Sequence, residues 1–363
     1  MSEGIRTKQL MFSVSAFITA SSILTKNLYA FTVQDSWMAI ILAVITSLII
    51  VAVYAALANR FPGCSLIEIN DAAFGPILGK AVSAMYIFYF LSLLYFNTLD
   101  LSSFIKEIIL PNTPVIMTIV MFVFICAWAV RTGAESMTRY GALLTFIVTG
   151  TILLNGFLLL KYVNIRNFLP MFTKPIKNYL IGTHIMTMLP LSEILCFIML
   201  FPYMKQKKDA GKALSGGLLI GAAVLFLIVV RDISVMGNVI QIASRPTFMV
   251  ARLVDVGEVL TRLEIIYAFI LIAMLFFKVS ILYFSAVSAI ARVLKLESYT
   301  YLIVIIGVLT VIYSMSIFDA AYEHAIWNMT AAATYSTFFI VLLPVVTLLT
   351  AVIRKASRTE TSL

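Results

Sequence analysis

Residues 189–193 read Leu-Pro-Leu-Ser-Glu and lie near the middle of a long apolar run, Tyr179–Met204. A helix needs roughly 20 mostly apolar residues to cross the hydrocarbon core of a bilayer, because lipid offers no partners for free backbone groups. The run is long enough to cross, but Pro190 removes a helical hydrogen bond at its centre. The stretch therefore predicts a membrane-spanning helix that is interrupted at mid-depth.

Composition extends this prediction to the whole chain of 363 residues. Hydrophobic residues make up 62% of it and charged residues 12%, against roughly 45–50% and about 25% in soluble domains. A water-soluble fold could not bury so much apolar surface. We therefore expect an all-α inner-membrane protein in which residues 1–363 form one integral membrane domain.

Ten segments have the length and apolarity of a membrane span. Three carry internal polar features, namely Gln9–Tyr29, Tyr179–Met204 and Ile265–Ala291. Seven contain no Asp, Glu, Lys or Arg, namely Trp37–Leu57, Ala81–Leu99, Val115–Val130, Tyr140–Leu160, Ala213–Val230, Tyr299–Phe318 and Asn328–Ile353. An even number of spans puts both termini on one side, which carries fifteen lysines and arginines against nine on the other. Since cytoplasmic loops are enriched in these residues, both termini are expected in the cytoplasm.

The formal charge of +9 does not indicate nucleic-acid binding, because the basic residues are scattered over short loops and form no single face. Contact with the anionic headgroups of the lipid bilayer explains them better. The three cysteines, Cys64, Cys126 and Cys196, show no spacing typical of a metal site or a disulfide framework. The sequence also lacks phosphate-loop, dinucleotide-binding and zinc-protease motifs. We therefore expect neither an enzyme nor a bound cofactor or metal.

Two ionisable side chains fall near the centres of predicted spans, Glu193 in the sixth and Lys278 in the eighth. A charge at the bilayer centre costs about 2.5–3.5 kcal/mol on insertion scales, so such residues usually face a cavity or a partner. Both are therefore candidates for a functional site, and a structural ion pair that locks two helices together is the alternative. His184, earlier in the sixth span, is interpreted as a packing residue rather than a proton carrier.

The first span shares the interruption of the sixth, since Thr19-Ala20-Ser21-Ser22 breaks its apolar run. These two spans begin two five-helix halves, expected at residues 1–165 and 178–355. Interruptions at corresponding positions of two halves are typical of transporter folds, in which broken helices offer free backbone groups to a ligand. The alternative is that the hydroxyls bond to their own helix and that Pro190 merely kinks its helix.

Two stretches resemble the B subunits of spore germination receptors, the GerAB-type spore permease family. The first runs from Leu191-Ser-Glu-Ile-Leu-Cys-Phe-Ile-Met-Leu-Phe-Pro-Tyr-Met-Lys into the Lys205–Lys208 cluster, and the second from Arg245-Pro-Thr-Phe to Thr261-Arg-Leu-Glu264. The similarity extends over essentially the whole chain. The family is a branch of the amino acid–polyamine–organocation transporters, so the resemblance implies a LeuT-like fold with a five-plus-five inverted repeat. It also implies a spore inner-membrane protein that senses nutrient germinants together with A and C subunits.

The sequence departs from the family pattern at two positions of the expected site. Relatives commonly have a glycine-rich break in the first helix, whereas this chain has Ala20-Ser21-Ser22, which unwinds less freely. Lys278 stands in the eighth span, where sodium-coupled relatives place a hydroxyl ligand for the ion. A tethered ammonium at this point could replace the coupling cation.

The interruptions and the resemblance together place a ligand between the first and sixth helices, bordered by the third and eighth. The expected ligand is a small polar metabolite such as an amino acid. The expected contacts are Thr19, Ala20, Ser21, Ser22 and Ile23 of the first helix, Leu93 and Asn97 of the third, Leu189, Pro190, Leu191, Ser192 and Glu193 of the sixth, and Lys278 of the eighth. Glu193 and Lys278 are expected to face one polar cavity.

Two functions fit this sequence, a receptor subunit that senses a nutrient and a secondary amino acid transporter that is proton-linked through Glu193. The fold alone cannot separate them, because function depends on the site. The charged stretch Arg245–Glu264 is expected to form short amphipathic helices on the outer face, as a lid or a subunit contact, or else a solvated loop. Gly217 and Gly221 form a GxxxG pair of the kind that allows close helix approach.

Overall fold

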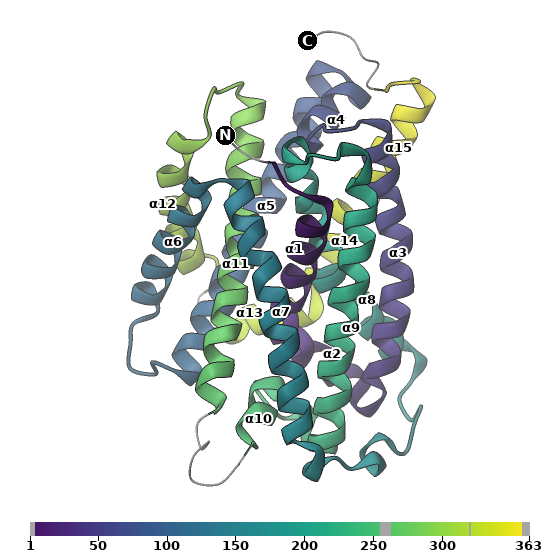
Figure 1. Cartoon of the computed structure of the whole chain (residues 1–363), viewed down its shortest axis with the longest axis vertical. Helices are drawn as coiled ribbons and strands as arrows, with labels where there is room; N and C mark the ends of the chain where they lie inside the picture. The colour runs from purple at the N-terminus through teal and green to yellow at the C-terminus, as the bar shows by residue number, and fades with distance from the viewer. Residues whose placement is uncertain (1–3, 255–262, 319–320, 358–363) are drawn as a thin grey trace.

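The computed structural model describes residues 4–254, 263–318 and 321–357, and this part of the chain is helical apart from its connections (Figure 1). The first half contains α1 (Thr7–Ala20), α2 (Thr25–Thr32), α3 (Ser36–Arg60), α4 (Leu66–Phe74), α5 (Pro76–Ile108), α6 (Val115–Thr132) and α7 (Ala134–Leu158). The second half contains α8 (Ile176–Met186), α9 (Ala210–Met236), α10 (Pro246–Arg252), α11 (Leu263–Val293), α12 (Thr300–Ser316), α13 (Ala321–Thr330), α14 (Ala332–Thr337) and α15 (Leu343–Ile353). Short 3₁₀ and π turns join several of these helices.

The described helices account for the ten predicted spans. Eight stretches are long and apolar enough to cross a membrane, and the first of them, Thr7–Arg60, has 54 residues. As one straight helix it would be roughly 80 Å long, against about 30 Å of hydrocarbon. It makes two passes instead, because the chain turns at Val33, whose φ of 47° ends α2. The shorter apolar helix α12, with 17 residues, supplies the tenth pass.

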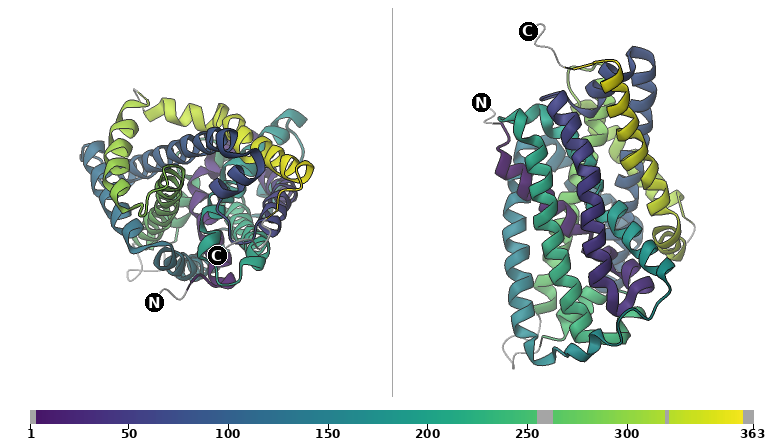
Figure 2. Two further views of the ribbon diagram at one scale, coloured as in Figure 1. Left: turned by 90° about the horizontal axis from the view of Figure 1, so that it is seen from above. Right: turned by 90° about the vertical axis from the view of Figure 1, so that its right-hand side faces the viewer.

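The two interrupted helices form the centre of the bundle (Figure 2). Every residue of α1 from Ser13 to Ala20 is buried, and so is every residue from Ile185 to Phe201 in the sixth pass. Helix α1 packs against α7, α9 and α11. The peripheral helices α6 and α12 instead expose large apolar side chains such as Trp128 and Tyr301, as a lipid-facing surface requires.

The GxxxG pair of α9 forms the contact with α1. A Cβ atom at Gly217 would lie 2.5 Å from the backbone oxygen of Met11, and one at Gly221 would lie 2.9 Å from Cβ of Ile18. Both distances are too short for any side chain. The two glycines therefore allow the backbones of α9 and α1 to pack directly against each other.

Both described ends of the chain lie at the same end of the bundle (Figures 1 and 2). The backbone N–H of Ile5 donates to the carbonyl of Tyr203 at 2.8 Å, and the N–H of Lys205 donates to the carbonyl of Ile5 at 3.0 Å. At the other terminus, Arg60 donates to the carbonyl of Ala356. An even number of spans requires this arrangement. Which membrane face it represents stays a prediction.

Several helices are longer than their predicted spans. Helix α5 continues past Leu99 to Ile108, and α9 continues past Val230 to Met236. Lys106 and Arg231, two of the nine basic residues that the predicted spans leave in loops on the side opposite the termini, are therefore helical residues. The reason is that the apolar run marks only the part of a helix in contact with lipid, whereas backbone hydrogen bonding continues beyond it.

Two stretches outside the predicted spans, the connection between the halves 1–165 and 178–355 and Arg245–Glu264, contain among their described residues only short helical segments before the next long helix begins. The connector between the halves forms two 3₁₀ turns, Leu160–Tyr162 and Ile165–Phe168, before α8 begins after Pro175. The stretch Arg245–Glu264 forms the short helix α10, as expected, followed by residues 255–262, which lie outside the described residues.

Candidate functional site

The interruption of the first helix is a tight 3₁₀ turn, Ser21–Leu24, between α1 and α2. The hydroxyl of Thr19 donates to the carbonyl of Ser15 and that of Thr25 donates to the carbonyl of Ser22, each at 2.8 Å. These bonds within the helix are the ones that serine and threonine form when they replace helical backbone bonds. The break therefore changes the pitch of the helix and the direction of the side chains that follow it, without a long unwound segment.

The interruption of the sixth helix is larger. After α8 the chain forms a π turn, Thr187–Leu191, that contains Pro190, and then a 3₁₀ helix, Glu193–Tyr203. The backbone N–H of Ser192 closes the turn on the carbonyl of Thr187 at 3.0 Å. A π turn inserts an extra residue, and such turns are frequent at functional sites. Glu193 consequently begins a new helical register at the centre of the bundle.

Glu193 and Lys278 are in direct contact at this centre. Lys278 Nζ lies 2.6 Å from Glu193 Oε2 and 2.6 Å from the hydroxyl oxygen of Ser21. Its ammonium also lies 5.0 Å from the ring centroid of Phe17, within the range of a cation–π interaction. Ser21, Glu193 and Lys278 thus connect the break of the first helix, the break of the sixth and α11.

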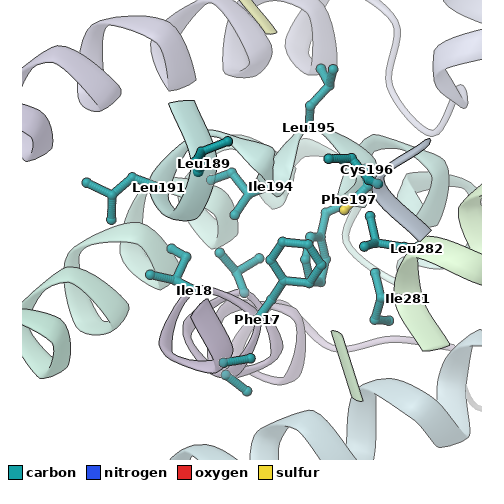
Figure 3. Close-up of a cluster of buried hydrophobic side chains, with 14 of the residues drawn as sticks. Phe17, Ile18, Leu189, Leu191, Ile194, Leu195, Cys196, Phe197, Ile281 and Leu282 are labelled. Atoms are coloured by element: carbon teal, nitrogen blue, oxygen red, sulfur yellow. The ribbon is translucent and has the colours of Figure 1, made fainter. Parts of the chain in front are cut away.

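This polar group is enclosed by apolar side chains. Lys278 is 0% and Glu193 2% exposed. Their sequence neighbours Ile194, Phe277 and Val279 belong to the hydrophobic core, and Figure 3 shows Phe17 of α1, Ile281 of α11 and Phe197 of the 3₁₀ helix in a cluster of buried hydrophobic side chains. The rings of Phe17 and Phe197 meet edge to face with centroids 5.3 Å apart. Removal of water strengthens the attraction between the two charges and makes the loss of either partner expensive.

The other expected site residues are distributed differently. Ser192 donates to the hydroxyl of Ser47 at 3.2 Å, so it faces α3. The side-chain amide of Asn97 donates to the carbonyl of Leu93 in its own helix at 2.8 Å. Four further expected residues of the two breaks, Ala20, Leu189, Pro190 and Leu191, are buried.

Two small cavities adjoin the break of the first helix. One is lined by Thr19 and Ser22 and the other by Ser22 and Ile23, together with residues of α11. Each has a volume of about 10 Å³, which is about the space of a single water molecule. Neither cavity can therefore hold a ligand larger than a water molecule in this conformation.

A second buried ion pair, which the sequence reasoning missed, lies nearer the end opposite the termini. Arg231 Nη2 lies 2.6 Å from Asp232 Oδ1, and the two residues are 7% and 0% exposed. The second oxygen of Asp232 accepts hydrogen bonds from the hydroxyls of Tyr29 at 3.0 Å and Thr247 at 2.6 Å. Arg231 also donates to Asn155 of α7 at 2.9 Å. The pair therefore joins α2, α7, α9 and α10.

The adjacent Arg-Asp pair at the end of an apolar run was the signal that could have revealed this network. An Arg and an Asp next to each other fit equally well in a solvated loop, and only the extension of α9 to Met236 buries them.

Ten passes with breaks in the first and sixth define the architecture of the LeuT-like transporters, and solved transporter structures share it. Mhp1, a nucleobase-cation-symport-1 family transporter in a closed conformation with bromovinylhydantoin bound, matches with a TM-score of 0.68 and 12% identity, covering 98% of this chain and 92% of that chain. A Na⁺-coupled sialic acid symporter matches with a TM-score of 0.64 and 11% identity, covering 98% and 91%. At this level of identity the similarity shows the fold alone. The chain is thus a membrane protein of the transporter-like five-plus-five class, and not of an enzyme fold.

Sequence comparison gives the family. The spore permease family model, described as "Spore germination protein", matches residues 4–321, and the chain belongs to this GerAB-type family. Spore germination protein KB of Bacillus subtilis (strain 168) is 25% identical over 359 residues, which cover 98% of this chain and 96% of the relative. Spore germination protein YndE of the same organism is 25% identical over 291 residues, covering 78% and 77%. The chain is therefore a multi-pass membrane protein of the germinant-receptor and transporter-like type.

Proposed function

We propose that this chain is the nutrient-sensing subunit of a spore germination receptor in the spore inner membrane. It binds a small polar metabolite such as an amino acid between the two helix breaks and passes a conformational change to A and C subunits. The observation that carries this proposal is the contact of Lys278 with both Ser21 and Glu193. This contact joins the two breaks, at which a transporter-like fold binds its ligand.

The small size of the cavities supports a sensing role. A ligand larger than water can enter between the breaks only if α2 and the Thr187–Leu191 turn move apart. A conformation that the ligand binds better becomes more populated when the ligand is present. Ligand binding at this point is therefore coupled to a movement at the centre of the bundle, which partner subunits at its periphery can detect.

Lys278 also supports a sodium-independent mechanism. Its ammonium lies between a hydroxyl oxygen of Ser21 and a carboxylate oxygen of Glu193, and oxygen atoms of these types are the ligands of hard cations. A covalently attached positive charge thus occupies the place at which a coupling cation would be bound. We propose that it holds the two breaks together permanently, whereas a sodium ion would do so reversibly.

The second candidate function is transport of the same metabolite, linked to proton binding at Glu193. It is favoured by the fold, because the solved structures that match are transporters and symporters. Uptake of a labelled germinant into vesicles containing the full chain separates the two functions. A sensor binds the molecule without accumulating it, whereas a transporter accumulates it in response to a pH gradient.

The proposed ligand position is tested by enlarging side chains around it. Ser22→Leu and Leu191→Phe add bulk at buried positions, so we expect the germinant concentration for a half-maximal response of spores to change at least tenfold. Leu153→Phe adds comparable bulk on α7, where Leu153 is 56% exposed, and serves as the control. Immunoblots establish that each variant is made at the normal level. A normal response at normal protein level in both buried variants would place the ligand elsewhere.

A further inference from the structure

A polar cavity of about 80 Å³ lies at the end of the bundle opposite the termini. Its walls come from the end of the Ser21–Leu24 turn, from α2, α5 and α13, and from the residues that precede α10. Neither Glu193 nor Lys278 lines it, although Ile23 and Leu24 at the end of the first break do. The cavity is therefore distinct from the central ion pair.

Most charges in this cavity already have partners. Arg245 Nε lies 2.9 Å from Glu107 Oε2 in an ion pair at the rim. Asp100 Oδ1 accepts a hydrogen bond from Asn328 at 3.3 Å and lies 3.7 Å from His324 Nδ1. These contacts fix the carboxylates of α5 in position.

Three groups facing the cavity keep unused bonding capacity. Lys26 of α2 makes no hydrogen bond or ion pair with another described residue. Its neighbour Asn27 is only 6% exposed, and its Nδ2 has no hydrogen-bond partner in the described part of the chain. On the opposite element, α5, the second carboxylate oxygen of Asp100 accepts no hydrogen bond from the described residues. A buried amide without a partner is unusual in a folded protein and calls for an explanation.

We infer that this cavity is a second binding site, specific for a small zwitterion such as a short α-amino acid. The ammonium of Lys26 and the amide of Asn27 bind the carboxylate of the ligand, and Asp100 binds its ammonium. The unused donors thus lie on α2 and the unused acceptor on α5, so a molecule with both charges satisfies all three groups at once. A ligand with one charge leaves one side unpaired.

The volume agrees with this ligand class. A single water needs at least about 10–15 Å³, so 80 Å³ holds roughly five to eight water-sized groups. The smallest α-amino acids have about five or six non-hydrogen atoms. Because Ile23, Leu24, Lys26 and Asn27 line the cavity, a bound zwitterion also contacts the end of the first break and the start of α2.

The inference rests on the proposed function only for the chemical class of the ligand. The test uses the purified full chain. Saturation-transfer NMR measures binding of glycine, L-alanine, L-serine and L-proline. Each is compared with its methyl ester, which lacks the negative charge, and with glycolate or lactate, which lack the positive charge. We expect saturable binding of at least one zwitterion. Its singly charged analogues should bind at least about tenfold more weakly, since the loss of a hydrogen bond to a charged group has about this effect.

Variants then assign each charge to its partner. Lys26→Met should remove the preference for the zwitterion over its ester, and Asp100→Asn should remove the preference over the hydroxy acid. Lys106→Met, which removes an exposed lysine of α5 outside this cavity, is the matched control and should bind normally. Lys26 makes no hydrogen bond or ion pair with a described residue, so its variant remains informative if Asp100→Asn fails to fold.

Two outcomes overturn the inference. One is the absence of saturable binding by all four zwitterions, and the other is binding that Lys26→Met leaves unchanged. Leu191→Phe distinguishes this site from the central one, because it should change the half-maximal germinant concentration of spores at least tenfold while purified protein still binds the zwitterion. Binding lost in Leu191→Phe and retained in Lys26→Met would support the central site and refute the second one.

Discussion

Removing one charge of the central ion pair should destabilise the protein more than removing both charges. Lys278→Met leaves Glu193 without its only hydrogen-bond donor among the described residues, so we expect the upper end of the about 3–5 kcal/mol typical of a broken buried pair. Glu193→Gln is milder, about 3 kcal/mol, because Ser21 and the ring of Phe17 still face the ammonium. The double variant leaves no charge uncompensated, and such replacements are often close to neutral.

The measurement is a double-mutant cycle on protein abundance and on the thermal denaturation of detergent-solubilised protein. A loss of 1–2 kcal/mol already changes abundance several-fold in cells, so the expected order of abundance is double variant, then Glu193→Gln, then Lys278→Met. Ser192→Ala removes a single hydroxyl bond to Ser47 at the same depth and should cost only about 0.5–1.5 kcal/mol. Additive effects in both measurements would refute the coupling of the two charges.

Three further predictions concern ion coupling, the second ion pair and topology. Replacement of sodium by potassium or choline in the medium should leave the germination response unchanged, because Lys278 takes the place of a coupling cation; a dependence on sodium would contradict this role. Arg231→Met should lower protein abundance, because Asp232 is left buried without its cation, at a cost of about 3–5 kcal/mol, whereas Arg252→Met, on the exposed side of α10, should not. With Cys64 replaced by alanine, Glu3→Cys and Glu360→Cys, both outside the described residues, should resist an impermeant thiol reagent in intact cells, and labelling of either would reverse the predicted orientation.

The sequence contains most of the information for the fold. Ten apolar runs predict the ten passes, and Pro190 and Ser21-Ser22 mark the two breaks, because both features depend on local composition and on the absence of water in the bilayer. The depth of Glu193 and Lys278 in their spans predicted that both would face one site. Their depth could not show that they touch, since this depends on how the π turn before Glu193 rotates the helix.

Other parts of the site depend on tertiary structure that a single sequence does not encode locally. Ser192 was expected beside the ligand, yet the extra residue of the π turn directs it towards Ser47 on α3. The Arg231–Asp232 pair and the polar cavity around Asp100 lie where helices continue beyond their apolar runs. A hydropathy pattern assigns such residues to loops, although packing against α2 and α10 buries them.

The backbone contacts of Ile5 affect how the molecule can cycle. They tie the start of the first membrane pass to the end of the sixth, so the two central helices are fastened together at the end that carries both termini. A transporter that releases cargo at that end must break this fastening in every turnover and form it again. A sensor that opens only towards the opposite end can keep these two backbone hydrogen bonds at all times. Its two central helices then stay joined at the end that carries the termini and move apart only at the other end.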